Sequence, residues 1–306
     1  MDKNLRIVFL GTPEFAVASL RKLVENECMV VAVITAPDKP KGRGKQLGES
    51  AVKEYAKSVG LPILQPSNLK SPEFIEELKS YKADLQIVVA FRMLPVVVWD
   101  MPRLGTFNLH ASLLPQYRGA APINWSIING EKETGVTTFF LKHEIDTGQI
   151  IFQEKEEIKE KDNVGSLYER LMKKGGDLVV KTVHAIELGT YPQVEQDTSV
   201  ELKSAPKIFR ETCEIDWNQS TEKVRNFIRG LSPYPAAFTV LNGQNVKIFK
   251  VEAAPEKSTR KVGKYETDGK NFLRFKTADG ELNVEELQLQ GKKRMAIQDF
   301  LRGNQL

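Results

Sequence analysis

Residues 5–34 read LRIVFLGTPEFAVASLRKLVENECMVVAVI, and this stretch decides the fold. Leu5–Leu10 and Met29–Ile34 are near-continuous apolar runs, typical of strands that are buried on both faces of a sheet. The segment between them carries apolar residues near helical spacing. A strand, a helix and a second strand in this order favour a mostly parallel sheet with right-handed crossovers. We therefore expect an α/β, Rossmann-like first domain.

The turn after the first strand does not favour a nicotinamide cofactor. It reads Gly11-Thr-Pro-Glu and lacks the glycine pattern of dinucleotide-binding folds. No acidic residue closes the second strand to hold a ribose, since Asp38 lies beyond its end. We therefore do not expect a nicotinamide cofactor.

The segment Leu104–Pro122 carries the clearest chemical pattern in the chain. It begins as a short strand in which Thr106, Asn108 and His110 share one face, because side chains alternate along a strand. An amide and an imidazole thus lie together at the carboxyl end of a strand, where open α/β sheets bind their ligands. Taken alone, the pair is also compatible with an edge strand that contains a structural histidine.

Composition limits the class of protein. The chain has 306 residues, which favours about two domains, and its apolar content of 41% is ordinary for globular proteins. No window approaches the roughly 20 apolar residues of a membrane span, and the first residues lack the features of a signal peptide. Cys28 and Cys213 are far apart and have no neighbouring ligand pattern. We expect a cytoplasmic protein without a disulfide or a metal site.

The last third of the chain differs from the rest in charge and pattern. Residues 203–306 contain 19 lysines and arginines against 13 acidic residues, whereas residues 1–202 contain 25 against 27. Five short strands with hairpin turns such as Asn242-Gly243 predict a smaller OB-like β-barrel, a common platform for nucleic acids. We expect a catalytic domain at residues 1–189, a linker at 190–206 and a basic domain at 207–306.

A basic segment interrupts the first domain. Residues 36–48 contain four cations within seven positions, between glycines and prolines. Connections in compact α/β folds usually take about 2–6 residues, so we expect an exposed loop that is long for its place. A solvated surface loop and a site for phosphates are both compatible with this composition.

Four motifs together resemble the folate-dependent formyltransferases: Asn108-x-His110, Ser112-Leu-Leu-Pro115, Arg118-Gly-Ala-Ala-Pro122 and Asp146-Thr-Gly148. The resemblance extends over nearly the whole chain and is strongest to the members that act on methionyl initiator tRNA. It implies 10-formyltetrahydrofolate as co-substrate, methionyl initiator tRNA as partner and N-formylmethionyl-tRNA as product. It also implies an enzyme of translation initiation. We expect a monomer that needs neither a membrane nor a metal.

The chemistry of formyl transfer suits the residues of these motifs. Transfer to an amine develops an oxyanion and releases a proton, so the site needs a hydrogen-bond donor and a proton acceptor. We expect Asn108 to donate to the oxyanion and His110 either to donate to the oxyanion or to relay a proton. We expect Asp146 to tune the imidazole and to accept a proton, directly or through water. The resemblance further implies folate contacts from Met93, Leu94, Ser112, Leu113, Leu114 and Pro115. It implies tRNA contacts from Lys41, Arg43 and Lys45.

One departure from the family pattern is visible before Leu94. The family commonly has Ala-Tyr-Gly and one further residue before its Leu-Pro, whereas this chain has the shorter Phe91-Arg92. Two alternatives also remain at this point. A formyltransferase or formyl-folate hydrolase could act on a small acceptor such as an amino-sugar nucleotide or water. A nucleic-acid binder on the same fold would have no activity.

Overall fold

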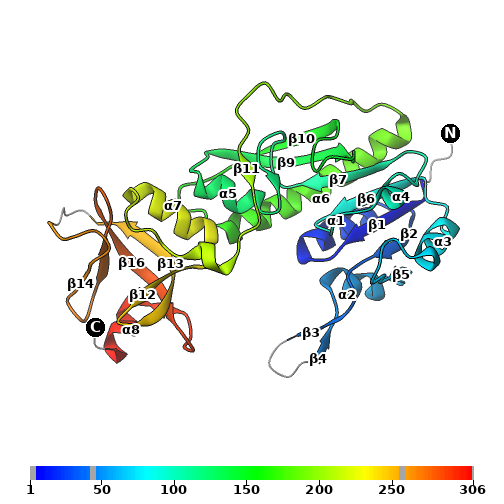
Figure 1. Cartoon of the computed structure of the whole chain (residues 1–306). Helices are drawn as coiled ribbons and strands as arrows, with labels where there is room; N and C mark the ends of the chain where they lie inside the picture. Colours follow the sequence, from blue (N-terminus) through cyan, green and yellow to red (C-terminus); the bar gives the residue numbers. More distant parts are fainter. Residues whose placement is uncertain (1–4, 42–45, 255–258, 305–306) are drawn as a thin grey trace. The chain divides into compact units, whose positions relative to one another are not determined.

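The computed structural model describes residues 5–41, 46–254 and 259–304 (Figure 1). The chain packs as two compact units. The first comprises Met1–Arg118, Gly135–Glu156 and Tyr168–Lys203, and the second comprises Gly119–Thr134, Glu157–Leu167 and Ser204–Leu306. The units are therefore not continuous along the sequence, and the division that we expected at residues 189 and 206 stays a prediction.

Seven strands of the described residues form the sheet of the first unit, in the order β10-β9-β7-β6-β1-β2-β5. The five neighbouring strands from β7 to β5 are parallel to one another, and β9 is antiparallel to β7. This arrangement confirms the mostly parallel α/β sheet. The strands are β1 (Ile7–Gly11), β2 (Val30–Ile34), β5 (Ile63–Leu64), β6 (Leu85–Val89), β7 (Thr106–His110), β9 (Glu133–Phe140) and β10 (Ile150–Glu157).

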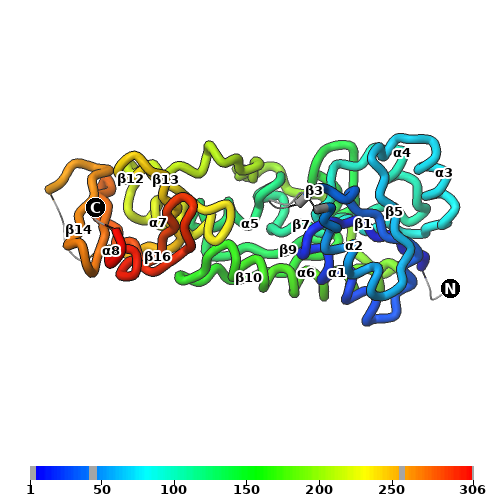
Figure 2. Tube along the Cα trace, turned by 90° about the horizontal axis from the view of Figure 1, so that it is seen from below, coloured from blue at the N-terminus to red at the C-terminus, as the bar shows by residue number. Residues whose placement is uncertain are grey.

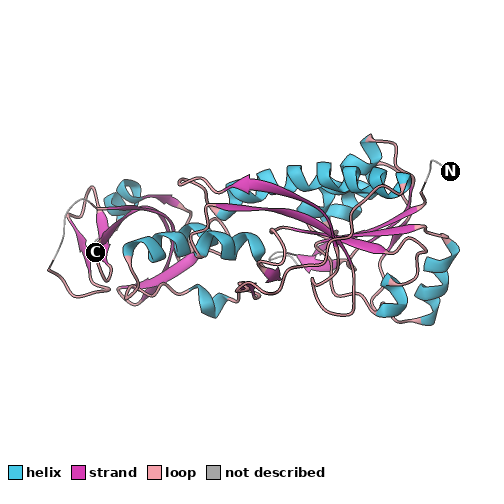
Figure 3. Cartoon of the chain, turned by 90° about the horizontal axis from the view of Figure 1, so that it is seen from above, coloured by secondary structure: helices cyan, strands magenta, loops and turns pink. Residues whose placement is uncertain are grey.

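Helices cover both faces of this sheet, as the view in Figure 3 shows. On one face α1 (Glu14–Glu25) packs against α6 (Val164–Leu188), with the ring of Phe15 5.2 Å from that of Tyr168. On the other face α3 (Pro72–Ser80) and α4 (Val96–Trp99) bury a cluster with side chains of β1, β2 and β6. The helix α2 (Ala51–Ser58) lies beside α1.

The strand β7, which lies between β9 and β6, has the two faces that its sequence predicts. A Cβ atom added to Gly175 of α6 would lie 2.7 Å from Leu109, so Leu109 packs closely against that helix. Thr106 faces the other side, because its hydroxyl donates to the carbonyl of Trp99 in α4 at 2.6 Å. Asn108 and His110 follow the same alternation as Thr106 and lie on the α4 side.

We had expected the basic segment to be a loop, but part of it forms a hairpin. Lys39–Lys41 (β3) and Gln46–Gly48 (β4) pair as antiparallel strands, with Lys39 opposite Gly48 and Pro40 opposite Leu47. Paired backbone hydrogen bonds satisfy polar groups that a loop would leave to water, which favours this hairpin. The residues between the two strands lie outside the described part of the chain.

The second unit contains a curled antiparallel sheet of six strands within the described residues, in the order β12-β13-β16-β15-β14 with β17 on β16. This confirms the antiparallel strands that the hairpin turns predict. Register shifts between Ile248 and Val251 bend β13 against β16. The strands are β12 (Ala237–Leu241), β13 (Gln244–Ala253), β14 (Tyr265–Thr267), β15 (Leu273–Lys276), β16 (Glu281–Leu289) and β17 (Met295–Ala296).

Helices close the core of the second unit. Figure 2 shows α7 (Thr221–Leu231) beside β13, and α8 (Ile297–Gly303) packs on β16. Trp217 stacks on Phe275 with ring centroids 4.3 Å apart. The same unit contains α5 (Pro122–Ile128), whose residue Asn124 donates to the carbonyl of Gly230 in α7 at 2.8 Å. Short elements complete the chain: β8 (Arg118–Gly119), β11 (Ser204–Ala205) and a 3-10 helix (Arg210–Cys213).

Within the residues described, no helix combines the length and the apolar character needed to cross a bilayer.

Candidate active site

The carboxyl ends of the parallel strands bring the predicted residues to one edge of the sheet. β7 ends at His110, β6 is followed by Met93 and Leu94, and β5 is followed by Gln65. Parallel strands end on the same side, so these connections meet along one edge, where open α/β sheets bind ligands. The site is therefore built in the first unit from segments that are far apart in sequence.

His110 is held in a defined orientation. Its side chain is buried, and its Nε2 lies 2.8 Å from the carbonyl oxygen of Tyr117. A carbonyl oxygen can only accept, so Nε2 carries the proton and Nδ1 of the neutral ring has a free lone pair. On that side Nδ1 lies 3.9 Å from Oδ2 of Asp146. The sequence predicted this pair, and the structure brings both members together across 36 residues of chain.

Asn108 is available as a hydrogen-bond donor. It lies one strand step before His110, on the same face of β7, and its side chain is half-buried. Within the described part of the chain, its side-chain amide has no hydrogen-bond partner. Because a buried polar group normally finds a partner, this amide is suited to donate to a bound molecule.

Hydrogen bonds from β9 hold the segment after β7 in place. The hydroxyl of Thr137, which lies opposite His110, donates to the carbonyl of Ser112 at 2.6 Å and accepts from the backbone of Leu114 at 3.2 Å. Gln153 donates to the carbonyl of Leu114 at 2.8 Å. The hydroxyl of Ser112 is itself bound to the carbonyl of Gln116 at 2.6 Å, so it serves the loop and is not poised as a nucleophile.

The six residues predicted to bind folate differ in the exposure of their side chains. Leu94 and Leu114 are buried, and Leu94 belongs to the core cluster under α4. Their contribution to a ligand is therefore limited to backbone groups. Leu113 and Pro115 are half-buried, and Met93 is exposed by 73%.

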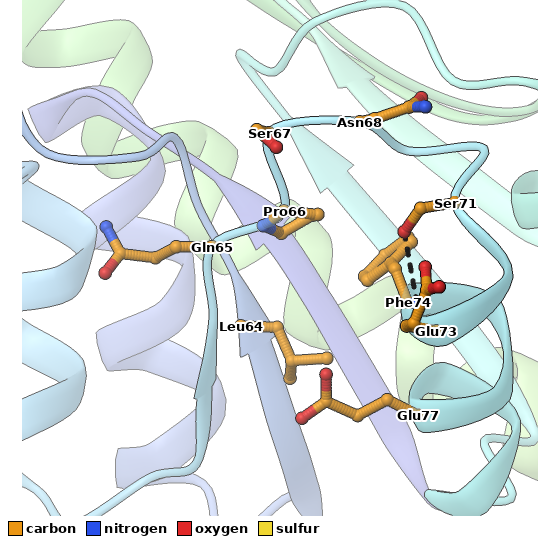
Figure 4. A pocket seen from close by; sticks show the side chains of 9 residues that line it. All are labelled: Leu64, Gln65, Pro66, Ser67, Asn68, Ser71, Glu73, Phe74 and Glu77. Carbon is orange, nitrogen blue, oxygen red and sulfur yellow. Dashed lines mark hydrogen bonds between the residues drawn. The ribbon is translucent and has the colours of Figure 1, made fainter.

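Arg92, the departure noted in the sequence, has a structural partner. Its guanidinium donates to the carbonyls of Ser67 and Pro66, and it lies over the ring of Phe91 at 5.8 Å. It thereby joins the connection after β6 to the connection after β5. Beside the latter lies a hollow of about 320 Å³ (Figure 4). Its lining comprises Leu64, Gln65, Pro66, Ser67, Asn68, Ser71, Glu73, Phe74 and Glu77.

The loop that carries Asp146 is held by Gln196 and Arg118, neither of which was among the predicted site residues. Gln196 donates to the carbonyls of Asp146 and Gly148 at 2.8 and 2.9 Å, and Arg118 donates to the amide oxygen of Gln196. Nearby, hydrogen bonds from Gln149 and then Lys142 hold the pKa of Glu195 below its usual range. Arg118 stood within a recognised motif, but Gln196 lies in a polar segment that resembled a plain linker.

Three further features bear on the site: His143, the absence of a metal-binding group among the described residues, and the basic hairpin. The ring of His143 lies edge-on to Trp99 at 5.5 Å, which anchors the start of the Asp146 loop. In the described ranges no group of three or more His, Cys, Asp or Glu residues is arranged to hold a metal ion. Arg43 and Lys45 lie outside the described residues, and Lys41 is described only as the end of β3.

Comparisons with known proteins match two successive ranges of the chain. The sequence model of a family described as "Formyl transferase" matches residues 5–183, and that of "Formyl transferase, C-terminal domain" matches residues 207–305. A protein of Bacteroides fragilis named methionyl-tRNA formyltransferase is 58% identical over 309 residues, covering 98% of this chain and 95% of that protein.

Solved structures share the fold at lower identity. HypX from Aquifex aeolicus, in complex with tetrahydrofolic acid, is 20% identical with a TM-score of 0.63; the match covers 98% of this chain and 47% of HypX. This chain thus spans about half the length of HypX. An N-formyltransferase from Helicobacter canadensis, solved with folinic acid and dTDP-3-aminofucose, is 22% identical with a TM-score of 0.65. That match covers 92% of this chain and 98% of the other.

Proposed function

The chain belongs to the formyl transferase family, and on this premise we propose that it formylates methionyl initiator tRNA. The donor is 10-formyltetrahydrofolate, the acceptor is the α-amino group of the methionyl residue, and the product is N-formylmethionyl-tRNA for translation initiation. The observation that carries the proposal is the 58% identity to the Bacteroides fragilis methionyl-tRNA formyltransferase over nearly the full length of both chains.

The small-acceptor alternative has weaker support. The Helicobacter canadensis enzyme, crystallised with an amino-sugar nucleotide, shares the fold at 22% identity. The basic C-terminal range, residues 203–306, and the basic segment at residues 36–48 also suit a polyanionic acceptor better than a sugar nucleotide.

In the proposed reaction the acceptor amine attacks the formyl carbon, and the bond from that carbon to the folate nitrogen then breaks, so no serine or cysteine nucleophile is needed. The amine loses a proton, and the departing folate nitrogen gains one. Negative charge develops on the formyl oxygen, and the amide of Asn108 donates to it. Removing one such donor typically costs about a hundredfold to a thousandfold in rate. The half-buried position of Asn108 excludes part of the competing water, which strengthens this hydrogen bond.

His110 receives the proton of the amine at Nδ1. The carbonyl of Tyr117 fixes the proton on Nε2, so Nδ1 is the basic atom, and it faces Asp146. A proton that arrives at Nδ1 makes an imidazolium flanked by a carbonyl and a carboxylate, both of which stabilise positive charge. Asp146 thus favours the protonated state that forms as the amine attacks.

The folate supplies the formyl carbonyl when it is bound. The exposed Met93, the backbone of Leu94 and the segment Ser112–Pro115 line the edge of the sheet beside Asn108, and we assign folate contacts to them. These residues offer apolar side chains and backbone polar groups beside the unpartnered amide of Asn108. Such a surface suits the flat, polar pterin ring of folate. HypX, which shares this fold, is described in complex with tetrahydrofolic acid.

Contacts to the tRNA and the organisation of the chain complete the proposal. Lys41, Arg43 and Lys45 contact phosphates of the acceptor arm, and the basic C-terminal domain at residues 207–306 adds further contacts. Residues 1–189 form the catalytic domain, with 190–206 as the connection. We propose a cytoplasmic enzyme that acts as a monomer.

Acceptor competition tests this function. The protein is incubated with 10-formyltetrahydrofolate labelled in the formyl group, together with methionyl initiator tRNA, an amino-sugar nucleotide, or no acceptor. The proposal predicts label in methionyl-tRNA at a rate far above that in the sugar nucleotide or in free formate. Faster transfer to the sugar nucleotide, or release of formate that tRNA does not suppress, would establish the small-acceptor alternative.

A further inference from the structure

The segment Val194–Gln196, which we call the strap, lies along the loop that carries Asp146. The backbones of Val194 and Ile150 exchange two hydrogen bonds, at 2.8 and 3.0 Å. The carboxylate of Glu195 accepts from Lys142 at 3.2 Å and from Gln149 at 2.7 Å. The strap therefore contacts the loop at both of its ends.

Gln196 holds the middle of the same loop. Its Nε2 donates to the carbonyl of Asp146 at 2.8 Å and to that of Gly148 at 2.9 Å. Its Oε1 accepts from Nε and Nη2 of Arg118 at 3.1 and 2.6 Å. A guanidinium can only donate, so Arg118 fixes the amide with its oxygen toward the arginine and its nitrogen toward the loop. The orientation of Gln196 is thus determined by chemistry on both sides.

Asp146 needs such support because of its backbone. Its φ is +56°, in the left-handed region that is uncommon for residues other than glycine. The backbone must keep this conformation for the carboxylate to lie 3.9 Å from Nδ1 of His110. Gln196 binds the carbonyl of this very residue, so it acts on the torsions that place the carboxylate.

We propose that Gln196, oriented by Arg118, is a positioning residue that sets the carboxylate of Asp146 against His110. This inference rests on the roles of His110 and Asp146 proposed above. Gln196 touches neither the acceptor nor the folate in this account, and it acts only through the Asp146 loop. The segment between the two matched regions of the family is thereby part of the catalytic apparatus.

The test replaces Gln196 by methionine, which has a similar length and removes all four hydrogen bonds. A misplacement of about 1 Å can cost up to about a hundredfold in rate. We expect kcat to fall by about tenfold to a hundredfold, while KM for the tRNA and for the folate each change by less than about threefold. Gln219→Met is the matched control, because Gln219 is exposed and donates only to Asp216 within the described residues.

A double mutant of Gln196 and Asp146 distinguishes a positioning role of Gln196 from a general structural role. In an Asp146→Asn background, Gln196→Met should lower kcat little further, because the effects of mutating residues that act as a unit are not additive. The pH–rate profile of Gln196→Met should shift in the same direction as that of Asp146→Asn. Full additivity, or a kcat within about twofold of wild type, would overturn the proposal.

Two further arms keep the test decisive. If the methionine variant does not fold, Gln196→Asn retains an amide that is one methylene too short to bridge Arg118 and the loop, and the same loss of kcat is expected. If wild type does not formylate methionyl-tRNA, the proposed function fails. The strap is then tested on release of formate or transfer to the sugar nucleotide, where the same non-additivity with Asp146→Asn is required.

Discussion

Replacing Gly148 by alanine should displace the catalytic loop without removing any functional group. A Cβ at this position would lie 1.5 Å from the carbonyl oxygen of Phe140 and 2.7 Å from its carbonyl carbon. Both atoms belong to the backbone at the end of β9, which cannot move aside as a flexible side chain would. The loop must therefore move, and Asp146 lies two residues from the clash.

The size of the displacement follows from these distances. Close carbon–oxygen contacts in proteins lie at about 3.3 Å, so the loop must shift by about 1.5–2 Å. If Asp146 recedes from 3.9 Å to about 5.5 Å from His110, their charge interaction weakens by about 1.2 kcal/mol at an effective dielectric of about 20. That alone is about eightfold in rate, and misplacement of a reacting group can extend the loss to about a hundredfold.

The assay compares initial rates of methionyl-tRNA formylation with thermal unfolding. Overpacking typically costs about 1–3 kcal/mol, which a domain with about 5–15 kcal/mol of stability tolerates, so we expect a folded and slow variant. Gly303→Ala is the control, because a Cβ there meets nothing within 4 Å. A Gly148→Ala protein with a rate within about twofold of wild type would refute the claim that loop geometry places Asp146.

Three further predictions concern stability, reactivity and the basic hairpin. Phe107→Ala should lower the free energy of unfolding by about 3–5 kcal/mol in urea titrations, because this fully buried ring lies in the centre of the sheet; a loss below about 1 kcal/mol would contradict the packing. Burial raises the pKa of the Cys28 thiol to about 11, so alkylation by iodoacetamide should be slow at pH 8 and accelerate as the pH rises through 10; fast alkylation at pH 8 would exclude this environment. Arg43→Ala should weaken tRNA binding, reduce its salt slope by about one and leave melting unchanged, whereas an identical slope would mean that Arg43 contacts no phosphate.

The core of the first unit was predictable because its strands are local apolar patterns. Leu5–Leu10 and Met29–Ile34 were expected to be strands from their apolar character, and the structure has Ile7–Gly11 as β1 and Val30–Ile34 as β2. The alternation of side chains likewise predicted that Asn108 and His110 share a face of β7. A buried strand is apolar in its own sequence, so it can be identified without knowing which elements it contacts.

The strap was not predictable because its partners are distant in sequence. Gln196 meets Asp146 and Arg118 across 50 and 78 residues, and nothing in its neighbours indicates such a contact. A polar segment that hydrogen-bonds to a loop has the same composition as a solvated linker. The pairing of β3 with β4 was missed for a related reason, since prolines and glycines favour a loop in any sequence-based expectation.

The packing of α5 illustrates a further limit. Its residues 122–128 precede β9 in the chain, yet they pack with α7 in the second unit. A Cβ added to Gly230 of α7 would lie 2.6 Å from Ile128, so the two helices approach closely. An apolar helix in sequence shows that it is buried but not which unit buries it.

The most direct test of the account is the single-turnover rate of methionyl-tRNA formylation by Asn108→Ala, with 10-formyltetrahydrofolate saturating. Asn218→Ala serves as the control, because Asn218 lies in an exposed turn of the second unit. We predict a loss of about a hundredfold to a thousandfold for Asn108→Ala, with unchanged tRNA binding and melting temperature, since one oxyanion donor is removed. A folded Asn108→Ala protein that transfers the formyl group at near wild-type rate would contradict it.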